Sequence, residues 1–130
     1  MVPMLVRILR DAGQGDSPWG YWQIHAGDEV IGDIEFHGPP DMAGIVEIGY
    51  EIVPAWQRRG VATWAVGELL TIGIEHGVQE FRAEVHGDNI ASVRVLQRSG
   101  FTGSGTEADT TLWTHLVDPH HSPQTRDFCR

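Results

Sequence analysis

Hydrophobic and polar positions alternate along several stretches of the chain, which is the pattern of half-buried β-strands. Residues 21–26 alternate in this way, Gly27-Asp28-Glu29 supplies a turn, and residues 30–36 alternate again. Further strands are predicted at residues 45–53, 80–86 and 110–117. The pattern therefore predicts a sheet whose early strands form a hairpin.

Other stretches repeat apolar side chains every three or four positions, the spacing of an amphipathic helix. Residues 61–76 carry two neighbouring apolar stripes and stop at Gly77, so we expect a mostly buried helix there. Residues 90–99 follow Asn89, a favourable helix N-cap, and end at Gly100. A short N-terminal helix is predicted from Leu5, Ile8, Leu9 and Ala12, and residues 103–109 are expected to form a loop.

A turn with two arginines and a glycine, Gln57-Arg58-Arg59-Gly60-Val61-Ala62, separates the strand at 45–53 from the helix at 61–76. The first N–H groups of a helix have no intrahelical partner, and the helix dipole adds partial positive charge there. Gly60 allows backbone to approach an anion closely, so the turn is typical of a phosphate site. An ordinary strand–helix connection with exposed arginines has the same sequence pattern. The turn alone therefore does not distinguish a phosphate site from such a connection.

Four motifs occur together in one order and spacing. They are Ile48-Gly49-Tyr50-Glu51-Ile52-Val53-Pro54, Gln57-x-x-Gly60-x-Ala62-Thr63, Asn89-x-x-Ser92 and Gly100-Phe101. Over residues 19–117 the chain thereby resembles the GNAT superfamily of N-acetyltransferases, and most of all its ribosomal-protein N-terminal (RimJ/RimL-like) branch. The resemblance implies an α+β fold: a twisted mixed sheet with helices on its faces and two splayed, parallel central strands.

The resemblance also implies an acyl-CoA-dependent N-acyltransferase. Its reaction moves the acetyl group of acetyl-CoA to a primary amine, on a small molecule or a peptide N-terminus, by direct attack in a ternary complex. A backbone N–H near residues 50–52 is expected to stabilise the developing oxyanion. The cofactor-binding residues that it implies are Ile52, Val53, Gln57, Arg58, Arg59, Gly60, Val61, Ala62, Thr63, Asn89 and Ser92.

Two proton transfers need side chains. An alkyl ammonium has a pKa near ~10, so a base must deprotonate it at neutral pH, and Glu47 and Glu51 on one face of the central strand are the candidates. The alternative for either glutamate is a solvated acid on a half-exposed sheet face, with no catalytic role. Many relatives protonate the leaving thiolate with a tyrosine where this chain has Leu96, whereas the ribosomal-protein branch implies Ser92. The alternative is that Asn89 and Ser92 only cap their helix.

The N-terminal part departs from the family pattern of a strand and two helices that build the acceptor side. Few residues precede the hairpin, so we expect the first strand to be missing and residues 1–13 to be a remnant of the second helix. Trp64 stands where relatives commonly carry glutamate. A second candidate function is therefore a non-catalytic acetyl-CoA-binding or interaction module. An uncovered sheet edge favours a homodimer, unless residues 1–13 fold over the gap.

Composition bounds these interpretations. With 130 residues, 41% hydrophobic and 21% charged, the chain is expected to be one soluble domain at 1–117 followed by a loose tail at 118–130. A formal charge of −9, with no lysine, argues against nucleic acid and suits a cationic acceptor, although solubility also explains it. No apolar run approaches a membrane span, and no signal peptide is evident, so we expect a cytoplasmic protein. The single cysteine, Cys129, and scattered histidines predict no disulfide and no metal site.

Overall fold

The alternating stretches form a seven-stranded mixed sheet in the computed structural model, which describes residues 6–10, 15 and 17–118. The sheet order is β1-β2-β3-β4-β5-β7-β6, and only the β4–β5 pair is parallel. The strands are β1 (Val6–Arg10), β2 (Tyr21–Ala26), β3 (Glu29–Phe36), β4 (Ile45–Ile52), β5 (Glu80–His86), β6 (Thr102–Glu107) and β7 (Thr110–Leu116). The α+β fold and the predicted hairpin are confirmed.

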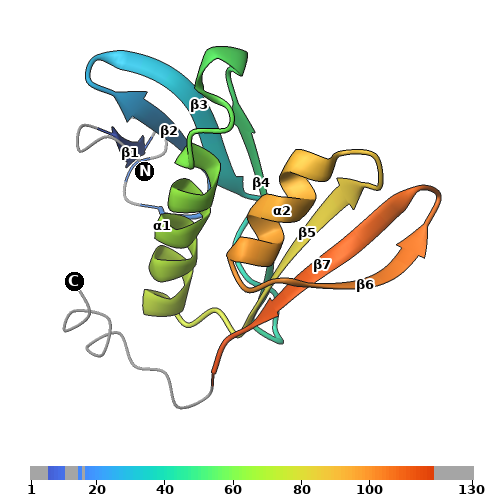
Figure 1. Cartoon of the computed structure of the whole chain (residues 1–130). Coiled ribbons are helices and arrows are strands. Elements are labelled where there is room, and N and C mark those ends of the chain that lie inside the picture. Colours follow the sequence, from blue (N-terminus) through green and yellow to red (C-terminus); the bar gives the residue numbers. More distant parts are fainter. Residues whose placement is uncertain (1–5, 11–14, 16, 119–130) are drawn as a thin grey trace.

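Two helices, α1 (Val61–Glu75) and α2 (Ile90–Arg98), lie on the same face of this sheet (Figure 1). The side chains that they bury against the strands form one core, which includes Ile24, Ile34, Val46, Ile48, Leu69, Phe81 and Leu96. The predicted ends of α1 and α2 are confirmed at the positive-φ residues Gly77 and Gly100, and buried Phe101 folds back so that its N–H donates to the Leu96 carbonyl (2.9 Å).

The parallel strands β4 and β5 pair over a short length only. Their register runs from Ile45 opposite Glu80 to Glu47 opposite Arg82, and beyond Glu47 the two strands part. The predicted splay of the central strands is therefore confirmed. Both helices begin at the end of the sheet where the strands diverge (Figure 1).

The N-terminal prediction is wrong in two respects. The chain forms strand β1 where a helix was expected, and this strand pairs with β2, with Val6 opposite Ala26 and Arg10 opposite Trp22. The spacing of Leu5, Ile8 and Leu9 suits a helix, but the free edge of β2 satisfies the β1 backbone, and Val6 packs into the core. The first strand, which was expected to be missing, is thus present, and residues 11–20 join it to β2 at the place where the family pattern has two helices.

The expected loop at residues 103–109 is also wrong, because β6 pairs with β7 there, with a register shift between Ser104 and Thr106. Every residue of β6 is exposed and none is apolar, which is why alternation gave no signal. The expected tail from residue 119 onward, including Cys129, lies outside the described residues. Within residues 6–10, 15 and 17–118, no helix is long and apolar enough to cross a membrane. The same part of the chain holds no group of three histidine, cysteine or acidic side chains arranged to hold a metal ion.

Candidate active site

The turn between β4 and α1 presents an uncapped helix N-terminus. Gly60 takes the N-cap position in the left-handed conformation (φ 82°, ψ 2°), and no side chain caps the helix. The first helical hydrogen bond runs from the Trp64 N–H to the Gly60 carbonyl (3.0 Å), so the N–H groups before it have no intrahelical acceptor. Arg58 also has a positive φ (64°), which costs a non-glycine residue free energy.

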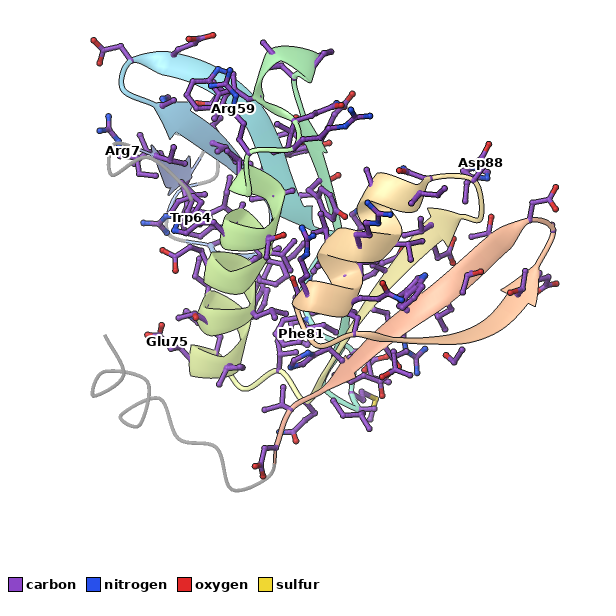
Figure 2. The ribbon with its side chains drawn as sticks, viewed as in Figure 1. Arg7, Arg59, Trp64, Glu75, Phe81 and Asp88 are labelled. Carbon is purple, nitrogen blue, oxygen red and sulfur yellow. The ribbon has the colours of Figure 1, made fainter. Side chains whose placement is uncertain are left out.

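Two side chains fix the shape of this turn. The Gln57 amide donates to the Ile52 carbonyl (2.9 Å) and so ties the turn to the end of β4. The Arg59 guanidinium lies over the Trp56 ring, 4.9 Å from its centroid, at the start of α1 (Figure 2). An exposed arginine is thereby held beside the free N–H groups, and the local field favours an anion.

Unpaired backbone of β4 lines the gap between the central strands. The Glu47 carbonyl accepts from the His37 N–H (2.8 Å), and the Val53 N–H donates to Ile31 (2.9 Å), so odd-numbered residues of β4 face β3. Because the direction alternates along a strand, the N–H groups of Tyr50 and Ile52 face the side where β5 has moved away. The gap is therefore lined by hydrogen-bond donors and acceptors that no strand uses.

The first turn of α2 forms the opposite wall of this gap. The Asn89 side chain accepts from the Ser92 N–H (3.2 Å), so the predicted capping role is confirmed. The Tyr50 hydroxyl lies 3.5 Å from the Ser92 carbonyl and joins β4 to α2 across the gap. Burial raises the pKa of the Tyr50 hydroxyl, and its hydrogen bond at Ser92 acts in the opposite direction. Tyr50 thus stays a neutral phenol at neutral pH.

The sheet face opposite the helices carries the two candidate glutamates. Val46 and Ile48 enter the core, so Glu47 and Glu51 project from the other face of β4. Because the two residues are four positions apart in an extended strand, their Cα atoms are about 13 Å apart along the strand. We therefore assign the two carboxylates separate roles. Glu47 stands at the point where β4 and β5 part, whereas Glu51 lies nearer the arginine turn.

A hollow of about 490 Å³ opens beside Glu51 on this acidic face. Its lining includes Tyr21, Gln23, Asp33, Glu51 and Pro54. Asp33 lies directly opposite Glu51 in the β3–β4 register. Burial, then the charges of Glu35 and Glu51, raise the pKa of the Asp33 carboxyl. Two adjacent carboxylates in a hollow favour the binding of a cationic ligand.

Trp64 lies on the side of α1 that faces β1, away from α2 (Figure 2). It is partly buried against the core cluster. The departure at this position therefore does not alter the gap between β4 and β5. It supplies apolar cover for the strands near β1.

Sequence reasoning missed three polar residues around the gap: Asp33, His37 and the hydroxyl of Tyr50. Asp33 had a weak signal, since it alternates with apolar residues on a predicted strand. His37 begins a stretch that reads as loop by composition, and its position depends on the β3–β4 register, which is not local in sequence. Tyr50 packs against the core, and its hydroxyl also reaches α2, a contact that no local pattern indicates.

Comparison with known proteins places this geometry in a class. Residues 4–102 match the acetyltransferase (GNAT) domain family. The chain belongs to the GNAT acetyltransferase family. A relative from Bacillus subtilis (strain 168), the uncharacterized N-acetyltransferase YoaA, is 37% identical over 87 residues, which are 65% of this chain and 49% of that protein. The chain thus spans about half the length of this curated relative.

Solved structures share the fold. RimL, a ribosomal L7/L12 alpha-N-protein acetyltransferase in complex with coenzyme A, superposes with a TM-score of 0.70 at 23% identity, over 75% of this chain and 62% of that one. The microcin C7 self-immunity acetyltransferase MccE, in complex with acetyl-CoA and AMP, gives a TM-score of 0.67 at 21% identity, over 75% of this chain and 60% of that one. At these identities the likeness establishes the fold.

Proposed function

We propose that this protein is an N-acetyltransferase that moves the acetyl group of acetyl-CoA to a primary amine by direct attack in a ternary complex. One observation carries the proposal: β4 and β5 part beside a helix N-terminus that no side chain caps and that two arginines flank. Family membership gives this gap its chemistry, since relatives of this fold are solved with coenzyme A and acetyl-CoA.

The arginine turn suits the pyrophosphate of acetyl-CoA. The N–H groups of the turn from Arg58 to Thr63 and the adjacent guanidinium groups would hold its negative charges. Gln57 serves by fixing the turn, because its amide is engaged with Ile52. Asn89 and Ser92 approach the same gap from α2 and complete the cofactor site. When bound, acetyl-CoA supplies the activated acetyl thioester.

The unpaired backbone of β4 suits the thioester end. Ile52 ends the strand next to the arginine turn, and its N–H would pair with the pantetheine chain. The expected pairing of Val53 is not available, because its N–H donates to Ile31 and its carbonyl accepts from Trp56. The Tyr50 N–H points into the gap and is our candidate donor to the developing oxyanion. A backbone donor of this kind is held in place by the β3–β4 ladder and needs no reorganisation during the reaction.

Proton transfer is assigned by position. Glu47 stands where the strands part, on the face opposite the helices, and we propose it as the base that deprotonates the acceptor ammonium. Glu51 and Asp33 would instead attract the cationic acceptor to the hollow. On the helix side, the Ser92 hydroxyl makes no hydrogen bond to any described residue, which leaves it available to protonate the leaving thiolate.

A second candidate function remains, a non-catalytic acetyl-CoA-binding module. The short connection at residues 11–20 favours it, because the family builds part of the acceptor side with helices there. Calorimetric titration with acetyl-CoA, followed by a thiol-release assay over an amine panel, separates the two. Binding with turnover of at least one amine supports the transferase. Binding without turnover of any amine supports the module.

The proposal includes a homodimer. Among the described strands β1 is an outermost one, with 41% of Leu9 exposed, and Val30 of β3 is 48% exposed. Exposed sheet edges and apolar side chains are surfaces that proteins usually cover. A second copy at this side would cover them and complete the acceptor side. Light scattering at micromolar concentration tests this, and a mass near 14.4 kDa that persists on concentration would refute it.

A further inference from the structure

The face opposite the helices holds a histidine between two carboxylates at the point where the central strands part. The His37 Nε2 atom lies 3.4 Å from an Oε1 of Glu35, and its Nδ1 atom lies 3.4 Å from Oε2 of Glu47. Both glutamates are partly shielded, with 22% and 42% of their side chains exposed. The three side chains form a continuous row from β3 to β4.

The backbone holds this imidazole against β4. The His37 N–H donates to the Glu47 carbonyl (2.8 Å), which fixes the start of the side chain. Gly49 leaves the space that the ring occupies, because a Cβ built there would lie 3.0 Å from Nε2. Any larger residue at this position would push the ring away. The sequence thus provides a bare stretch of β4 under the imidazole, one residue from the proposed oxyanion donor Tyr50.

We propose that His37 is a positioning and relay residue that acts through Glu47. This inference rests on the proposed function. Glu47 takes a proton from the acceptor ammonium, so that an N–H bond breaks and an O–H bond forms. The proton then passes to Nδ1 of His37, in the tautomer that carries its hydrogen on Nε2, and the Nε2 hydrogen passes to Glu35 and to solvent.

The chemical balance of the reaction agrees with this route. The neutral amine attacks the thioester carbonyl, a C–N bond forms, the C–S bond breaks, the attacking nitrogen loses a proton, and the thiolate takes one. Because the acceptor starts as an ammonium ion and ends as an amide, one proton is released per turnover. The row from Glu47 through His37 to Glu35 gives this proton a path to solvent on the face opposite the helices.

The charged surroundings of His37 come from four strands. Glu35 on β3 and Glu47 on β4 flank the ring, and Arg82 on β5 is the register partner of Glu47 but binds Glu80. Tyr21 on β2 contacts Glu35, and this hydrogen bond and the charge of Glu35 raise the pKa of the Tyr21 hydroxyl. Tyr21 thus remains protonated and able to hydrogen-bond to the end of the row.

Steady-state kinetics with acetyl-CoA and three acceptors (butylamine, spermidine and an Ala-Ala-Ala peptide) test the relay. His37→Gln and His37→Ala should each lower kcat/KM by about tenfold. This loss is smaller than the roughly 10²–10⁴-fold rate contribution of a general acid–base catalyst, because Glu47 is still present. The dissociation constant for acetyl-CoA should stay within about twofold. In wild type kcat/KM should rise across the pH range where histidines titrate, and this limb should be lost in His37→Gln.

Imidazole rescue and a matched histidine separate a relay from a structural role. Added imidazole should restore part of the activity of His37→Ala and none of that of Glu47→Gln. His25→Gln is the control, because the His25 ring hydrogen-bonds to Gln23 (3.1 Å) on the same face, whereas the row of two glutamates joins His37. Variants of His37 that match His25→Gln at every pH would overturn the relay, as would a loss of activity that imidazole fails to restore.

A measurement without turnover keeps the relay testable by itself. In NMR spectra of the folded protein at constant pH, the His37 ring signals should move in Glu47→Gln and stay in place in His25→Gln, because the His37 ring contacts Glu47. Unchanged His37 ring signals in Glu47→Gln would overturn the inference whether or not an amine is acetylated. The proposed function fails separately, if folded wild-type protein releases no thiol with any amine.

Discussion

Replacing two glycines of α1 by alanine should change the free energy of unfolding in opposite directions. Gly67 is exposed, and a Cβ there meets nothing within 4 Å. A Cβ on Gly73 would lie 2.5 and 2.6 Å from two ring carbons of Phe81, which is fully buried. The same substitution in the same helix thus adds a methyl group to open space in one case and to the core in the other.

The magnitudes follow from two competing effects. Alanine in place of glycine favours a helix by about 1 kcal/mol, so Gly67→Ala should stabilise the protein by up to that amount. Overpacking a core costs about 1 to 3 kcal/mol, so Gly73→Ala should destabilise the protein by up to a net ~2 kcal/mol after the helix gain of about 1 kcal/mol. At about 4 °C per kcal/mol, the two variants should melt several degrees apart.

Urea unfolding followed by tryptophan fluorescence measures both values. A Phe81→Leu background supplies a further control, since a smaller side chain leaves room for the new methyl group. In that background the cost of Gly73→Ala should shrink, as a double-mutant cycle would report. If Gly73→Ala proves as stable as Gly67→Ala, the packing of α1 on β5 is not as described, and the position of the arginine turn at the start of α1 comes into question.

Two other predictions concern the site itself. Ser92→Ala should lower turnover far more than acetyl-CoA affinity, and if both constants stay within about threefold of wild type, less than ~1 kcal/mol, Ser92 is only part of the helix cap. Asp33→Asn should be more stable than wild type at neutral pH, because a raised carboxyl pKa means that the ionised form costs folding free energy. This advantage should shrink as the pH falls through the raised pKa and be absent below about pH 4, the ordinary range of aspartate, in pH-dependent denaturation; an advantage that grows at low pH would contradict the sign.

The sequence predicted the parts of the fold whose periodicity and termini agree. The helix α1 has two apolar stripes and ends near Gly77, and α2 starts at the Asn89 cap, so local signals sufficed. Strand β1 was mispredicted because a stretch of five residues fits both the helical and the strand periodicity. Pairing with the edge of β2 makes it a strand. Strand β6 has no apolar residue to reveal it.

The candidate site divides in the same way. The arginine turn and the Asn89 cap are contiguous motifs, so their positions at the two helix N-termini were predictable. The different surroundings of Glu47 and Glu51 were not, because they depend on where β5 leaves β4 and on which β3 residues lie opposite. The contact between His37 and Glu47 likewise requires the register of β3 on β4.

The most direct test of the central claim is a calorimetric titration of Gly60→Glu with acetyl-CoA. The new side chain puts bulk and negative charge where the pyrophosphate is proposed to lie. Gly27→Glu is the matched control, because Gly27 also has a positive φ (61°), meets nothing within 4 Å, and lies in the β2–β3 hairpin. We expect wild type and Gly27→Glu to bind acetyl-CoA alike and folded Gly60→Glu not to bind. Unchanged affinity in Gly60→Glu would contradict the account.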